Sequence, residues 1–136
     1  AFLLLPFTGR LVDRRGYQAA LVLGLLLLAL VMARLGTGPH PYELPAAALL
    51  GGLGFSLFLP GWNGLLAKNL PQENRAAIWG SLMTVEGLGL ALGPVAGGLL
   101  WEAFGLPAPF LAGSGIFLAL SLFYLLLFRV RKLWRR

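Results

Sequence analysis

The sequence predicts an all-α integral membrane protein with four transmembrane helices. It is 58% hydrophobic and only 12% charged, whereas an ordinary soluble domain is about 25% charged. The mean hydropathy is +0.80. The charged residues are also clustered, and the apolar stretches between them are long. Because about 20 apolar residues cross the ~30 Å hydrocarbon core as a helix, four of these stretches are long enough to span a bilayer.

The expected spans follow the uncharged stretches, at about 17–34, 44–67, 76–101 and 107–128. Residues 1–7 are apolar but too short to cross alone, and we interpret them as the end of a preceding helix. The chain begins with Ala1 and has neither the basic start nor the small-residue cleavage site of a signal peptide. We therefore expect residues 1–136 to be a single membrane-domain fragment that lacks earlier helices.

Short loops separate the spans: "GTGPHPYELP" (36–45), "KNLPQENR" (68–75) and "EAFGLPAP" (102–109). Their glycines and prolines are typical of turns between helices. His40 lies between two prolines in the first loop, where a plain turn role is favoured over a metal or proton role. No cysteine is present, and no cluster of metal-ligating residues is recognisable, so we predict no metal site and no cofactor.

The basic residues predict the orientation. If the loop at 9–18 is cytoplasmic, alternation of the spans places all but one of the 11 Lys and Arg residues on the inside, and only Arg34 outside. This positive-inside bias predicts a multi-pass protein of the inner (plasma) membrane with a cytoplasmic C-terminus. It also accounts for the net charge of +6 without a nucleic-acid partner. The basic tail at 129–136 is interpreted as a stop-transfer anchor in contact with membrane lipid, rather than a specific lipid site.

No enzymatic site is recognisable. The sequence has no Ser/His/Asp set within reach and no phosphate-binding glycine loop with its lysine. We therefore predict neither an enzyme nor an ATP-driven pump.

The loop "GRLVDRRG" (9–16) resembles a loop motif of the major facilitator superfamily, G-x-L-x-D-R-x-G followed by two basic residues. The matching positions are Gly9, Leu11, Asp13, Arg14 and Gly16, while Tyr17 and Gln18 stand where the family has its basic pair. Gly9 and Gly16 permit a tight turn between helix ends, and Asp13 suits a neighbouring helix N-terminus. The resemblance implies a cytoplasmic gate loop that latches two helical bundles.

The third span is similar to the antiporter signature of the same family, G-x8-G-x3-G-P-x2-G-G. The matching residues are Gly80, Gly89, Gly93, Pro94, Gly97 and Gly98. Three of the glycines recur every four residues, so they form one smooth stripe on a helix. Small residues in such a stripe allow two helices to approach closely in lipid. We expect this stripe to be a helix-packing motif.

The resemblance covers nearly the whole chain and implies that it is part of a twelve-helix bundle. The signature belongs most typically to the fifth helix, which would place the chain in the N-terminal half. The helix before it, however, normally carries an arginine that "PAAALLGGLG" (45–54) lacks, and the chain stops just past its last span at a basic tail. We favour the C-terminal half, helices nine to twelve with the end of eight, and expect the remaining half of the transporter as a partner.

Glu86 is the sharpest functional candidate, because it lies roughly 15 Å into the third span. A carboxylate there costs about 2.5 kcal/mol or more, and a group that loads and unloads a proton is what a proton-coupled transporter requires. Two structural roles compete and are favoured: pairing with a basic residue of the missing half, or a hydrogen bond to Thr84, Ser81 or a backbone carbonyl. Asn63 and Trp62 in the second span are candidates for either substrate contact or packing.

The resemblance implies a secondary transporter, and we favour one that couples proton entry to the efflux of small apolar or drug-like molecules. The alternatives are an uptake transporter for a sugar, organic acid or peptide, and a non-transporting membrane assembly subunit. Uptake of a polar substrate would call for more buried polar groups than Glu86 and Asn63 provide.

Overall fold

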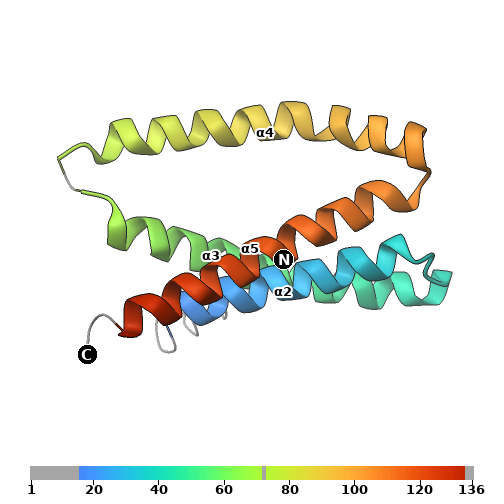
Figure 1. Cartoon of the computed structure of the whole chain (residues 1–136), viewed down its shortest axis with the longest axis horizontal. Coiled ribbons are helices and arrows are strands. Elements are labelled where there is room, and N and C mark those ends of the chain that lie inside the picture. Colours follow the sequence, from blue (N-terminus) through green and yellow to red (C-terminus); the bar gives the residue numbers. More distant parts are fainter. Residues whose placement is uncertain (1–15, 72, 134–136) are drawn as a thin grey trace.

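The computed structural model describes residues 16–71 and 73–133, with side chains described up to residue 130. Its elements are α2 (Tyr17–Gly36), the short 3₁₀ helix η1 (Pro41–Glu43), α3 (Leu44–Asn69), α4 (Arg75–Phe104) and α5 (Pro107–Leu133) (Figure 1). The four α-helices are long and apolar enough to cross a membrane. The predicted fold class, all-α with four spans, is confirmed.

Each expected span lies within one helix, and the helices extend past the spans at their ends. α5 continues to Leu133, so residues 129–133 of the basic tail prolong this helix instead of following it. The expected end of a preceding helix at 1–7, the loop residues Gly9, Asp13 and Arg14, and residues 134–136 lie outside the described residues.

The turns use residues that interrupt helices. Gly16 precedes α2 with a φ of +92°, and Gly105 follows α4 with a φ of +86°, a backbone region that L side chains rarely adopt. The Gly105 N–H donates to the Trp101 carbonyl at 2.8 Å, which closes the last turn of α4. Pro60 and Pro94 lie inside α3 and α4. Neighbouring helices can accommodate such prolines in a membrane.

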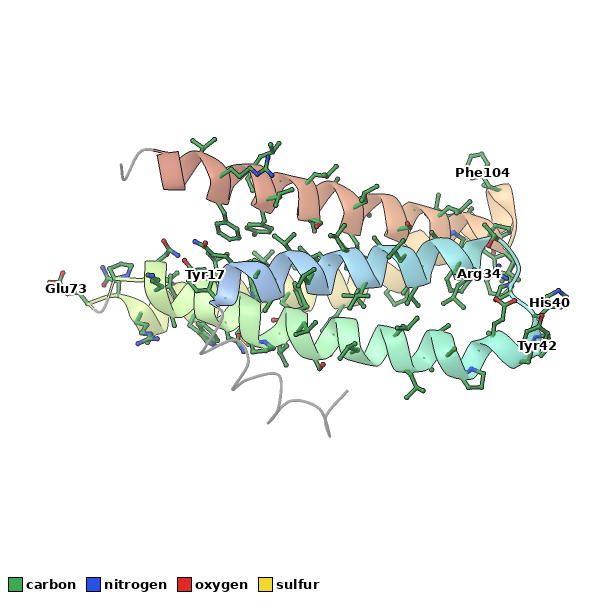
Figure 2. All side chains as sticks on the ribbon, turned by 90° about the horizontal axis from the view of Figure 1, so that it is seen from below. Tyr17, Arg34, His40, Tyr42, Glu73 and Phe104 are labelled. Carbon is green, nitrogen blue, oxygen red and sulfur yellow. The ribbon has the colours of Figure 1, made fainter. Side chains whose placement is uncertain are left out.

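α2 is the central helix of the described part of the chain. It packs against α3 on one side and α5 on the other, while the backbones of α3 and α5 do not come close to each other. Figure 2 shows these three helices as neighbouring rows with α2 in the middle. The core lies here, and 44% of the α2 span is buried.

α4 lies apart from this three-helix layer (Figure 1). Within the described part of the chain it contacts only α5, and none of its span is buried. Its exposed apolar side chains are typical of a surface that meets lipid or another helix. This separation matters for the candidate site, because Glu86 and the glycine stripe both lie on α4.

Candidate functional site

Glu86 lies well inside α4, roughly 17 Å from the start of the helix at Arg75. Its side chain is exposed on the helix surface. Among the described residues it has no hydrogen bond and no ion pair. A carboxylate without a partner at this depth is costly in lipid, so in a membrane it requires a proton, water or a cation from another part of the protein.

Glu86 shares a face of α4 with the glycine stripe. At 3.6 residues per turn, Glu86, Gly89, Gly93 and Gly97 fall within about a quarter of the helix circumference. Gly97 is partly covered near the end of α4 that meets α5. A Cβ atom placed on Gly89, Gly93 or Gly97 would still meet nothing within 4 Å. The stripe therefore has no close partner within the described residues.

The remaining signature residues behave in the same way. Gly80 and Gly98 also have open space around a built Cβ, and Pro94 is exposed within the helix. The predicted packing motif is thus presented on α4, and the described helices do not pack against it. The residues that would pack there must come from outside the described part of the chain.

Neither expected hydroxyl partner of Glu86 bonds to it. The Ser81 hydroxyl donates to the carbonyls of Ala77 and Ile78, at 3.1 and 2.9 Å. The Thr84 hydroxyl donates to the Gly80 carbonyl at 3.0 Å. Both side chains bond back to their own helix, as hydroxyls in transmembrane helices commonly do.

Asn63 and Trp62 have different environments. The Trp62 ring stacks on Phe58, with centroids 6.5 Å apart, and packs against the buried cluster that contains Leu21 and Phe128. Asn63 is exposed and has no hydrogen-bond partner among the described residues. Because α3 and α4 do not contact each other, the described structure does not bring Asn63 and Glu86 together.

Sequence reasoning missed the glycines that join α2 to α3. A Cβ on Gly24 would lie 2.6 Å from the Phe58 backbone nitrogen, and one on Gly61 would lie 2.7 Å from that of Leu21. These distances are closer than real Cβ contacts, so the two backbones approach because side chains are absent. Gly54 and Gly61 are seven residues apart, two turns along one face, and this spacing is the signal that could have revealed the contact.

Two serines join α5 to α2, and these were also not anticipated. The Ser114 hydroxyl donates to the Ala29 carbonyl at 2.8 Å, and the Ser121 hydroxyl donates to the Val22 carbonyl at 3.2 Å. Their spacing of seven residues places both on one face of α5. Hydrogen bonds of this kind link transmembrane helices where no hydrophobic force holds them together.

Two charged residues, Arg34 and Glu43, lie at the hairpin between α2 and α3. This hairpin is at the opposite end of the two helices from Tyr17. Arg34 Nη2 and Glu43 Oε2 form an ion pair at 2.5 Å, and Arg34 Nη1 donates to the Thr37 hydroxyl at 2.8 Å. The rings of His40 and Tyr42 stack with centroids 5.3 Å apart. No group of three His, Cys, Asp or Glu residues in the described ranges could hold a metal ion.

Comparison with known proteins gives a family match over almost the whole sequence. A model of the Major Facilitator Superfamily matches residues 1–135. The multidrug resistance protein MdtG of Salmonella arizonae is 38% identical over 119 residues, which cover 86% of this chain. The MdtG proteins of Salmonella newport and Salmonella typhi match to the same extent.

The same alignments cover only 29% of the length of these relatives. The chain thus corresponds to less than a third of a full relative. No solved structure shows a significant match.

Proposed function

We propose that this chain, which belongs to the Major Facilitator Superfamily, forms part of a proton-coupled transporter that exports small apolar or drug-like molecules. The family consists of multi-pass membrane transporters, which confirms that the chain is not an enzyme. The choice of efflux depends on one observation, the 38% identity to multidrug resistance proteins over 86% of the chain.

We assign proton coupling to Glu86. It is the only acidic or basic side chain deep within a span among the described residues. The hydrogen bonds of Ser81 and Thr84 go elsewhere, which weakens the structural role that relies on them. A carboxylate without a fixed partner can take up and release a proton as its surroundings change between water and lipid.

The main rival role for Glu86 is pairing with a buried cation elsewhere in the complete transporter. The proposal places the chain in the C-terminal half, so that a cation would belong to the remaining half. The two roles differ in whether the neutral glutamine can replace Glu86 without loss of stability, and a variant that tests this is described in the Discussion.

Dye efflux from bacteria that lack their own exporters tests the proposed function. Cells that produce the complete protein should expel a fluorescent lipophilic dye, and a protonophore should stop the export. Cells with the empty vector are the control. Absence of export, or export that persists after the proton gradient has collapsed, would contradict the proposal.

The proposed orientation has a separate test. A cysteine replacing Thr37, in the α2–α3 hairpin, should react with a membrane-impermeant maleimide from outside the cell. A cysteine replacing Asn74, before α4, should react only after the membrane is opened. Reaction of both positions from the same side would refute the proposed topology.

A further inference from the structure

A groove opens between α2 and α3 near the hairpin that joins them. Its volume is about 330 Å³, at the lower end of the ~300–1,000 Å³ of small-molecule sites. The lining residues are Leu27, Leu30, Val31, Arg34, Glu43, Ala46, Ala47 and Leu50. All of them except Arg34 and Glu43 are apolar, so the groove offers hydrocarbon walls and one charged end.

The groove exists because the two helices separate toward the hairpin. A Cβ on Gly54 would lie 3.0 Å from that of Leu27, whereas one on Gly51, a turn closer to the hairpin, would be 3.6 Å from the Val31 side chain. Beyond Gly51 the α3 side chains that face the groove include two alanines, Ala46 and Ala47. These methyl groups are too small to fill the space that the separation opens.

The charged end of the groove carries one group of each sign. The Arg34 and Glu43 side chains are 44% and 28% exposed, so both remain accessible while they pair with each other. Arg34 uses Nη2 for Glu43 and Nη1 for Thr37, and a guanidinium has further N–H donors. Glu43 Oε1 has no partner among the described residues. The pair has no net charge, yet it has a donor and an acceptor left over.

The groove lies at the membrane depth that a lipid headgroup and the adjoining part of its acyl chain occupy. Arg34 lies in the last turn of α2, a position where arginine reaches the level of the headgroups. From there the groove follows α2 back to Leu27, roughly 10 Å into the hydrocarbon region. Figure 2 shows Arg34 at the hairpin end of the helices, with His40 and Tyr42 beyond it.

We propose that this groove binds the upper part of one acyl chain of a zwitterionic phospholipid, whose phosphate contacts Arg34 and whose ammonium group contacts Glu43. Arginine is well suited to phosphate oxygens, and the carboxylate matches the ammonium of an ethanolamine headgroup. An anionic lipid would satisfy Arg34 and be repelled by Glu43, so charge complementarity favours the zwitterion. The site is separate from Glu86 and does not depend on what the transporter carries.

Filling the groove tests the acyl-chain part of the proposal. Ala47→Leu adds three carbons inside the groove, whereas Ala48→Leu adds the same volume on an exposed residue that does not line it. The complete protein is released from vesicles of equal phosphatidylethanolamine and phosphatidylglycerol, and the retained lipids are counted by native mass spectrometry. Ala47→Leu should lower the retained phosphatidylethanolamine at least threefold relative to Ala48→Leu. Equal retention by the two variants would overturn the proposal.

Changing the ion pair tests the headgroup part. Glu43→Gln leaves Arg34 without its counter-charge, so the ratio of retained phosphatidylglycerol to phosphatidylethanolamine should rise at least fivefold. Arg34→Gln should lower the retention of both lipids. If the phosphatidylglycerol-to-phosphatidylethanolamine ratio does not change in Glu43→Gln, headgroup recognition is overturned. The groove would then bind the apolar part of a molecule whatever its headgroup. Melting temperatures of the variants confirm that folded proteins are being compared.

Discussion

Two glycine-rich regions of this chain differ in what surrounds them. At the α2–α3 contact, a Cβ on Gly24 or Gly61 would collide with backbone atoms of the partner helix. On α4, a Cβ on Gly89 or Gly93 would meet nothing within 4 Å. A glycine in a transmembrane helix therefore permits another helix to approach closely, but its presence does not identify that helix. The α2–α3 glycines have their partner within the described chain, and the α4 glycines have none there.

The hydroxyl groups of α5 and α4 differ in a similar way. On the packed side, Ser114 and Ser121 direct their hydroxyls to carbonyls of α2. On α4, Ser81 and Thr84 bond back to their own helix, and Glu86 bonds to none of the described residues. Because lipid satisfies no polar group, Glu86 still needs a proton, water or a partner from outside the described residues, whereas Ser81 and Thr84 do not.

The largest effect is expected for Gly24→Ala. The added methyl would lie 2.6 Å from the Phe58 backbone nitrogen and 2.8 Å from the Gly54 carbonyl oxygen, so α2 and α3 must move apart. We expect the free energy of unfolding of the complete protein to fall by about 3 kcal/mol, measured by denaturant titration in detergent. The control is Gly51→Ala, where the methyl has ordinary contact distance and helix propensity favours alanine by up to about 1 kcal/mol. Equal losses in both variants would mean that the close approach is not what stabilises the pair.

Gly93→Leu tests whether the α4 stripe has a partner in the complete protein. If it does, a leucine there should overpack the contact, lower the free energy of unfolding by about 1–3 kcal/mol and impair dye export. Gly87→Leu is the matched control, because Gly87 lies about a third of the helix circumference away from Gly93. A fully stable and active Gly93→Leu protein would show that the stripe faces lipid.

Glu86→Gln should have a smaller effect on stability, less than about 1 kcal/mol, because glutamine keeps the shape of glutamate and no described residue pairs with it. Proton-driven accumulation of substrate in proteoliposomes should be lost, while exchange without a gradient should survive. The melting temperature of the same preparation provides the comparison. A drop of several kcal/mol would instead indicate a buried cation left unpaired, and coupled transport at the wild-type rate would exclude the proton role.

The smallest effects are expected for the serines of α5. Ser114→Ala and Ser121→Ala should each lower the free energy of unfolding by about 0.6 kcal/mol, the average for hydrogen bonds between transmembrane helices. The two losses should add, since the residues are roughly 10 Å apart along the helix. Ser81→Ala on α4 is the control and should change little. A loss in Ser81→Ala as large as in Ser114→Ala would mean that hydroxyls contribute through their own helix only.

The sequence was sufficient to predict the helices but not their pairing. Charge-free stretches locate spans because every backbone polar group must be satisfied within the membrane, and a helix does this alone. Which helices pack together depends on the complementary shapes of their surfaces, and the sequence pattern indicates these shapes only weakly. Gly54 and Gly61 are less regularly spaced than Gly89, Gly93 and Gly97. We therefore predict helix packing at the regular stripe on α4, whereas the less regularly spaced glycines of α3 are the ones that lie close to α2.

The candidate site was predictable only in part, for a related reason. A lone acid such as Glu86 is conspicuous in an apolar span, so its position on α4 could be read from the sequence. Its surroundings could not, because no described residue pairs with Glu86 and the chain spans less than a third of the length of its relatives. Trp62 illustrates the opposite case, since its stacking on Phe58 and its contact with the cluster around Leu21 arise from folding within the described chain.

The central place of α2 also sets an order of assembly. α3 follows α2 directly, so their hairpin can close as soon as both helices are made. The hydrogen bond from Ser121 to Val22 spans 99 residues, which at ~5–20 residues per second takes roughly 5–20 s of synthesis to complete. During that interval α2 has one side without its neighbour, and α4 enters the membrane before α5. Among the described helices, α5 is therefore made last and completes the packing around α2, which is made before the others.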